Sequence, residues 1–182
     1  MKEPSFEKLA IVGVGLLGGS LALAAKEHKL ADHVLGIGRS EESLKQAVEM
    51  GAIDDYTTDL AGGVAEADLV VLCTPVRHIA ASVPTVMAHI KPGAIVTDVG
   101  STKCTIVDVA EAAAASSRGT FVGAHPMAGS EKSGVAHARP DLFAGTNCFI
   151  TPTPRTPLQT LATVAAWWRA LGCRLAIARP QR

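Results

Sequence analysis

Short apolar runs alternate with longer amphipathic or alanine-rich segments along the chain. Residues 9–12 and 69–73 are apolar at every position, which is typical of parallel strands that are covered on both faces. Further strands are predicted at residues 33–37, 56–58, 94–97, 120–123, 148–150 and 174–177. Helices are predicted at residues 17–28, 40–50, 60–66, 76–90, 102–117 and 157–171, with a short one around residues 141–143. This alternation indicates an α/β fold with a doubly wound, mostly parallel sheet.

Length and charge narrow the class of protein. A chain of 182 residues is expected to form one domain, residues 1–182. Lysine plus arginine number 17 and aspartate plus glutamate number 17, so the formal net charge is zero. Nucleic-acid binders and polybasic membrane-surface proteins carry a basic surplus, so neither class is expected. Hydrophobic residues make up 48% of the chain and charged residues 19%, which excludes a disordered protein.

Two further features bear on the compartment. The uncharged stretch 9–25 contains four glycines and falls short of the ~20 apolar residues that a membrane-spanning helix needs. The four cysteines show no CxxC spacing and are interpreted as reduced thiols. The sequence therefore predicts a cytoplasmic protein that acts on a small molecule, with no nucleic-acid or membrane partner.

A glycine-rich loop lies between the first predicted strand and the first predicted helix. Residues 13–18 read Gly-Val-Gly-Leu-Leu-Gly and follow the pattern G-x-G-x-x-G. In such a loop the first glycine permits a tight turn, the second lets a pyrophosphate approach the backbone, and the third lets helix and strand pack closely. The helix N-terminus then offers unpaired N–H groups to the anion. The pattern predicts a Rossmann-type NAD(P)-binding domain whose cofactor contacts include Gly13, Gly15, Leu16, Leu17 and Gly18; the alternative is a glycine-rich seam for helix packing.

The end of the second predicted strand bears on the choice of dinucleotide. An NAD site normally has Asp or Glu there to bind the ribose 2′-hydroxyl. This chain instead has Arg39 and Ser40, while Asp32 precedes the strand. An arginine can pair with a 2′-phosphate, so NADP is favoured over NAD, with both residues in the cofactor site. The alternative for Arg39 is a solvated side chain without a ligand.

Three segments follow the carboxyl ends of later predicted strands, where ligands bind in open α/β sheets. They are residues 74–76, 98–103 and 123–132, and we expect them to converge near the nicotinamide, with Thr74 and Pro75 contacting the cofactor. His125 is the one histidine of six that is expected at such an end, inside a glycine-rich loop. A neutral histidine can accept a hydroxyl proton at pH 7. The other histidines lack metal-ligand spacing, so no metal site is expected.

Four segments together resemble the prephenate and arogenate dehydrogenases of tyrosine biosynthesis. They are residues 13–20 (GVGLLGGS), 73–76 (CTPV), 98–103 (DVGSTK) and 123–134 (GAHPMAGSEKSG). The resemblance covers nearly all of this chain but only the nucleotide-binding half of the family's usual protein. It implies oxidative decarboxylation of prephenate to 4-hydroxyphenylpyruvate, or of arogenate to tyrosine. Hydride leaves the carbinol carbon for NAD(P)+, CO2 is lost, and the ring becomes aromatic.

The resemblance also implies roles for individual residues. His125 is the catalytic residue that polarises the ring hydroxyl, and Ser101 supports it by a hydrogen bond to the substrate or to the imidazole. The alternative for Ser101 is a cap for the helix expected from residue 102. Lys103 is interpreted as a surface residue of that helix's first turn. Ser130, Glu131 and Lys132 are candidate substrate-binding residues, of which Glu131 shapes access; its alternative is a solvated carboxylate.

Family members continue into an all-helical domain that forms a homodimer and supplies cations for the substrate carboxylates. This chain ends where such a domain would begin, so the dimer is expected of full-length members rather than of this chain. Two other functions stay open. One is a non-catalytic dinucleotide-binding module, or an inactive fragment of such an enzyme. The other is a β-hydroxyacid or imine reductase, which would use a lysine on a later helix.

Overall fold

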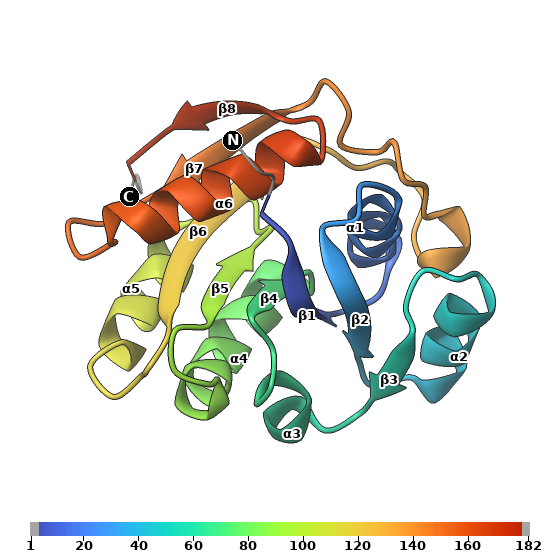
Figure 1. Cartoon of the computed structure of the whole chain (residues 1–182), viewed down its shortest axis with the longest axis horizontal. Coiled ribbons are helices and arrows are strands. Elements are labelled where there is room, and N and C mark those ends of the chain that lie inside the picture. The colour runs from blue at the N-terminus through green and yellow to red at the C-terminus, as the bar shows by residue number, and fades with distance from the viewer. Residues whose placement is uncertain (1–3, 180–182) are drawn as a thin grey trace.

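The computed structural model describes residues 4–179 as one sheet with helices on both faces (Figure 1). The first and last three residues of the predicted domain lie outside this range. The strands are β1 (Phe6–Val12), β2 (Ala31–Ile37), β3 (Asp55–Thr57), β4 (Leu69–Leu72), β5 (Ile95–Asp98), β6 (Thr120–Pro126), β7 (Asn147–Thr151) and β8 (Arg174–Ile177). The helices are α1 (Leu16–Glu27), α2 (Glu41–Glu49), α3 (Leu60–Val64), α4 (Val76–His89), α5 (Cys104–Ala113), the 3₁₀ turn η1 (Val135–His137) and α6 (Leu158–Ala170).

The strands are arranged in the order β3-β2-β1-β4-β5-β6-β7-β8. The first six are parallel and follow the order typical of dinucleotide-binding domains, with a switch point between β1 and β4. β7 runs antiparallel to β6, and β8 runs parallel to β7. The prediction of a doubly wound, mostly parallel sheet is confirmed. The reversal at β7 follows from a connection after β6 that contains η1 and turns instead of a crossover helix.

Alternating side chains of the central strands build two cores, one on each face of the sheet. Leu9 and Ile11 of β1 point to the face that α1, α2 and α6 cover, and Ala10 and Val12 point to the face that α3, α4 and α5 cover. All four side chains are at most 6% exposed. Helices on both faces explain why these strands are apolar at every position.

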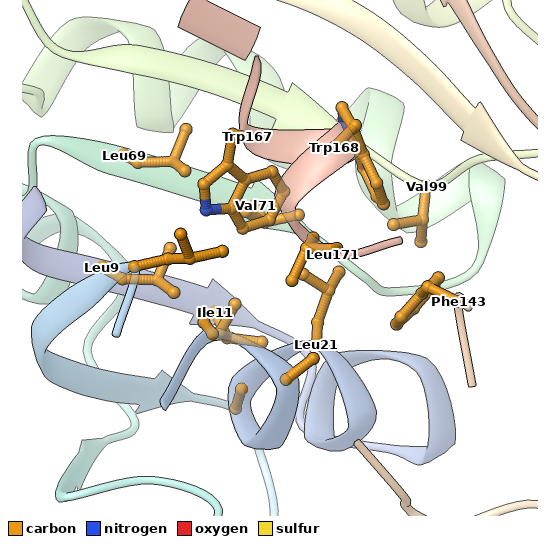
Figure 2. Close-up of a cluster of buried hydrophobic side chains, with 14 of the residues drawn as sticks. Leu9, Ile11, Leu21, Leu69, Val71, Val99, Phe143, Trp167, Trp168 and Leu171 are labelled. Carbon is orange, nitrogen blue, oxygen red and sulfur yellow. The ribbon is translucent and has the colours of Figure 1, made fainter. Parts of the chain in front are cut away.

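Helix α6 contributes the largest side chains of the first core. Trp167 and Trp168 are at most 1% exposed, and their ring centroids lie 5.1 Å apart at an edge-to-face angle of 75°. The ring centroid of Phe143 lies 5.9 Å from that of Trp168, and these two rings also meet edge to face. Figure 2 shows these rings packed with Leu9 and Ile11 of the sheet. The aromatic cluster therefore joins α6 and the segment before β7 to the central strands.

The segment between β6 and β7 differs from its prediction. The short helix expected around residues 141–143 is absent, because these residues form turns, and the helical turn lies at Val135–His137 instead. Leu142 and Phe143 are buried as single apolar anchors rather than as a helical face. Gly145, at a φ of 72°, turns the chain into β7. A run of apolar residues this short does not distinguish a helix from a buried turn.

Replacing Trp168 by alanine tests the aromatic cluster. We expect Trp168→Ala to lower the free energy of unfolding by about 3–5 kcal/mol, because it removes a fully buried ring and leaves a cavity. The matched control is Leu158→Ala on the same helix, where the side chain is 84% exposed and the change is expected to stay within about 0.5 kcal/mol. Urea denaturation measures both values. Equal effects of the two substitutions would contradict this assignment of the core.

Candidate functional site

A different geometric feature distinguishes each glycine of the predicted cofactor loop. Gly13 has a φ of 93°, and a Cβ added there would lie 2.7 Å from Cγ2 of Thr74. A Cβ on Gly18 would overlap the carbonyl oxygen of Gly13, so α1 and the turn can approach only without a side chain there. Gly15 has no atom within 4 Å of an added Cβ. A tight turn, an open approach and close helix packing are the three properties of a pyrophosphate-binding loop.

A cavity of about 600 Å³ lies beside this loop at the carboxyl ends of β1, β2 and β4. Residues 12–15, 37–40 and 73–75 line it, and the side of α4 contributes His78 and Ser82. Its volume falls in the range of cofactor pockets, about 300–1,000 Å³. The position at the β1–β4 switch point is where dinucleotides bind in this architecture. The contribution of α4 is not apparent from the sequence, because only the packing of α4 beside β4 turns His78 inward.

The predicted cofactor residues divide into two groups. The cavity lining includes Gly13, Gly15, Arg39, Ser40, Thr74 and Pro75. Leu16, Leu17 and Gly18 belong to the first turn of α1 and are not part of the lining; the two leucines pack against the first core. Their backbone N–H groups belong to the helix N-terminus, where intrahelical acceptors are lacking. These residues therefore offer backbone groups, not side chains, to an anion.

The carboxyl end of β2 is basic and polar. Arg39 and Ser40 are exposed, and the Ser40 hydroxyl accepts a hydrogen bond of 3.3 Å from the backbone N–H of Ser43, which caps α2. Asp32 lies at the start of β2, at the opposite edge of the sheet. Among the described residues that line the cavity, Arg39, His78 and Cys73 are ionisable and none is a carboxylate. The guanidinium of Arg39 can therefore donate hydrogen bonds to an anion at this end of β2.

Thr74 joins the glycine loop to β4. Its hydroxyl oxygen is buried, and none of the described residues forms a hydrogen bond with it. Its Cγ2 lies over Gly13, and Pro75 directly after it is the N-cap of α4. A buried hydroxyl at the edge of a cavity has a hydrogen bond left to offer to a ligand.

A buried ion pair connects the ends of β5 and β6. Nζ of Lys103 donates to a carboxylate oxygen of Asp98 and also, at 2.8 Å, to the carbonyl oxygen of Ala124. Asp98 in turn accepts the backbone N–H groups of Gly100 at 2.9 Å and Ala124 at 3.1 Å. The prediction that Lys103 is a surface residue is wrong, because its side chain turns inward from the N-cap of α5 and is 8% exposed.

Burial acts on both members of this pair in the direction of the neutral form. It raises the pKa of Asp98 and lowers the pKa of Lys103, while the charge of each partner opposes the shift of the other. The two groups can therefore be charged at this depth only together. Sequence reasoning missed the pair, although a carboxylate at the end of an apolar strand, five residues before a lysine, was the signal that could have found it.

His125 follows Ala124 directly and is part of β6, where it pairs with Phe149 of β7, rather than of the loop in which it was predicted. Its side chain is partly buried. Burial and the positive charge of Lys103 lower the pKa of His125, and Asp98 opposes this shift. A histidine with a lowered pKa is neutral at pH 7 and can accept a proton.

The remaining predicted residues are exposed. Ser101 does not cap a helix, because α5 begins at Cys104, after Lys103, and shows no side-chain cap. Ser130, Glu131 and Lys132 lie in the loop after β6, where the Ser130 hydroxyl accepts the N–H of Lys132 at 3.1 Å. Neither these residues nor Ser101 and His125 line the cavity. The described residues thus bring the cofactor candidates together but do not enclose the substrate candidates in the same pocket.

Further along the same connection, η1 packs against α1. The N–H of Arg139 donates to the buried hydroxyl of Ser20 at 3.0 Å, and a Cβ on Gly19 would lie 2.9 Å from both Val135 and Ala138. The segment after the candidate substrate loop is therefore anchored on the helix that begins at the glycine turn.

In residues 4–179, no group of three His, Cys, Asp or Glu side chains is placed to hold a metal ion. No helix in the described part of the chain has the length and apolar character needed to cross a membrane.

Comparison with known proteins adds independent findings. Residues 21–177 match the family described as "Prephenate dehydrogenase, nucleotide-binding domain". Prephenate dehydrogenase of Bacillus subtilis is 40% identical over 157 residues, which cover 85% of this chain and 42% of that protein. The family match begins after the glycine loop, so the geometry of residues 13–18 is separate support for nucleotide binding.

Two solved structures are similar to this chain over nearly its whole length. Prephenate dehydrogenase of Aquifex aeolicus, in complex with hydroxyphenyl propionate and NAD+, is 32% identical with a TM-score of 0.89, covering 98% of this chain and 62% of that chain. Arogenate dehydrogenase of Synechocystis is 31% identical with a TM-score of 0.87, covering 95% of this chain and 60% of that chain. The chain spans 38–57% of the length of the curated relatives it matches. The chain therefore belongs to the prephenate dehydrogenase family of oxidoreductases and carries the family's Rossmann-type nucleotide-binding domain.

Proposed function

We propose that this chain takes part in the NAD(P)-dependent oxidative decarboxylation of prephenate or arogenate. Family membership supports the reaction class. The observation that carries the assignment to particular residues is the position of His125: a histidine with a lowered pKa stands at the carboxyl end of β6, beside the Asp98–Lys103 pair. The product is 4-hydroxyphenylpyruvate from prephenate or tyrosine from arogenate.

The fit of a dinucleotide rests on three features of the chain. Gly15 leaves open space beside the loop, Thr74 has an unused buried hydroxyl, and the α1 N-terminus offers backbone N–H groups. When bound, the nicotinamide supplies a hydride acceptor. The protein's task is then to hold the ring carbinol and take its hydroxyl proton.

In the proposed reaction His125 accepts a hydrogen bond from the ring hydroxyl. It takes the hydroxyl proton as hydride leaves the ring carbon that bears this hydroxyl. Ser101 orients the hydroxyl or the imidazole, while Ser130, Glu131 and Lys132 bind the substrate. The electrons of the breaking C–CO2 bond then make the ring aromatic, and the proton returns to the phenolic oxygen. Aromatisation itself drives the loss of CO2, so no separate acid is needed for that step.

A second candidate is a dinucleotide-binding module without catalysis. It is favoured by the exposure of residues 130–132. The homodimer that the family resemblance implies is proposed for full-length members of the family. A reductase with a lysine on a later helix gains no support, because α6 contains no lysine. Fluorescence titration with NADPH beside an assay with prephenate separates the first two: binding without turnover favours the module.

Gly15→Ala tests the glycine loop directly. Because Gly15 has open space around it, we expect the variant to keep its Tm but to bind NADPH at least tenfold more weakly, about 1.4 kcal/mol. Gly18→Ala is the matched contrast and should destabilise the fold by about 1–3 kcal/mol, since its Cβ would overlap the carbonyl of Gly13. Thermal unfolding and fluorescence titration report the two effects. Unchanged affinity in Gly15→Ala would refute the proposed approach of the pyrophosphate.

NADP is the proposed preferred dinucleotide, with Arg39 as the partner of the 2′-phosphate. Arg39→Asp is expected to shift the ratio of NADPH to NADH affinities toward NADH, because a carboxylate repels the phosphate and accepts from the ribose hydroxyl. Arg77→Asp, an equal charge change at an exposed position of α4 outside the cavity lining, is the control. Titration with both dinucleotides measures the ratio; the same ratio in all three proteins would remove Arg39 from cofactor selection.

His125→Asn is expected to lower kcat by roughly 10²-fold or more, with dinucleotide binding unchanged. The control is His137→Asn at an exposed position of η1. The lowered pKa of His125 also sets the pH profile: kcat/KM should be level near pH 7 and fall as pH drops through that pKa, where the imidazole gains a proton. Steady-state rates in a form of the protein that turns over prephenate provide the test, and a near-normal rate for His125→Asn would exclude the proposed role.

A further inference from the structure

The backbone pairing between β5 and β6 ends before it reaches His125. Its last backbone pair is Thr97 with Val122, whereas β4 and β5 stay paired as far as Leu72 with Asp98. Beyond that point the connection from β5 to β6 is made by side chains: Asp98 accepts the N–H of Ala124, and Lys103 donates to its carbonyl oxygen. The ion pair therefore takes the place of the next step of the parallel ladder.

The stem of Lys103 follows the same path. A Cβ on Gly123 would lie 3.4 Å from Cδ of Lys103, so the aliphatic chain passes over this glycine to reach Ala124. On the opposite side, Ala124 pairs with Ile150 and His125 with Phe149 in the antiparallel ladder to β7. The backbone that carries His125 is thus held by β7 on one side and by the ion pair on the other.

An ion pair is a costly way to fill this space, because a hydrophobic pair of similar volume is often equally stable or more so. What an apolar pair cannot do is bind the N–H and the carbonyl of the same residue at once. The Asp98–Lys103 pair does this for the residue directly before His125. A displacement of about 1 Å at a reacting group can cost roughly 10²-fold in rate, so such a fixture has catalytic value.

We propose that Asp98 and Lys103 are positioning residues that fix the end of β6 and thereby set the place of His125 in the reaction. The catalytic part of this proposal rests on the function proposed above for His125. Neither residue needs to touch the substrate; both act through Ala124 and through their charges.

The groups that surround His125 make its titration a usable readout. Burial and the charge of Lys103, the N-cap of α5, lower its pKa, and Asp98 at the end of β5 opposes this shift. From β7, Cys148 is near: a hydrogen bond with Cys173 and burial raise the pKa of its thiol. Directly after β4, burial and the charge of Asp98 raise the pKa of the Cys73 thiol. Both thiols are neutral at pH 7, so the ion pair supplies the charge that His125 senses from these elements.

The experiment uses two variants and one control. Lys103→Met removes the charge and both hydrogen bonds of the lysine. Asp98→Asn combined with Lys103→Met keeps an acceptor for the N–H of Ala124 and avoids an unpaired buried charge, so this variant is the one expected to keep its Tm. The control is Lys91→Met, which breaks a comparable pair with Asp68, 2.6 Å long and partly exposed, beyond the N-terminal edge of β5.

NMR is used on each protein to titrate the His125 imidazole and to measure amide exchange of Ala124 and His125. Steady-state kinetics with prephenate and NADP+ give kcat and KM. In Lys103→Met we expect His125 to titrate at higher pH, because a nearby positive charge is lost. In both Lys103 variants the two amides should exchange at least tenfold faster and kcat should fall at least tenfold, with KM for NADP+ within twofold. Lys91→Met should change none of these.

The outcome separates this inference from the proposed function. If the folded double variant keeps the wild-type amide exchange and kcat, the positioning role is overturned. If the wild-type chain does not turn over prephenate, the enzymatic proposal fails for this chain, and amide exchange with the titration of His125 still decides whether the pair fixes the end of β6. Wild-type amide exchange in the double variant, together with an unshifted His125 titration in Lys103→Met, would then overturn the inference.

Discussion

The parallel arrangement of the strands is the constraint on which the site depends. Because β1, β2, β4, β5 and β6 run in the same direction, their carboxyl ends meet at one edge of the sheet, and the change of strand order between β1 and β4 opens a crevice there. The close contact of Gly18 with Gly13 lets α1 start directly above this crevice. Without it, the helix N-terminus would stand away from the place where an anion can bind.

The two parts of this edge are built by different means. On the β1–β4 side, glycines leave space beside the backbone, and none of the described residues that line the cavity carries a carboxylate. On the β5–β6 side, the buried ion pair of Asp98 and Lys103 holds the strand end that carries His125. An open surface leaves room for a large cofactor, whereas a proton acceptor must be fixed to a fraction of an ångström.

The connection after β6 runs between the β5–β6 side and the β1–β4 side of this edge. It leaves the end of the strand at His125, passes through the exposed residues 130–132, and is anchored by Ser20 and Gly19 on α1. The candidate substrate loop thus spans from His125, the proposed proton acceptor, to the helix that begins at the glycine loop. The curated relatives are longer than this chain, which spans 38–57% of their length.

The sequence by itself determined the alternation of strands and helices, the doubly wound class and the glycine loop, because each follows from local periodicity or from the absence of side chains at fixed spacing. It also identified the family from short motifs such as residues 123–134. Only the tertiary structure decided the antiparallel place of β7, the inward side of α4 with His78, and the burial of Lys103 beside Asp98. Each of these depends on which segments meet across the sheet. Lys103 looks like a surface residue in its local context, and its role becomes visible only when β6 brings Ala124 to its ammonium group.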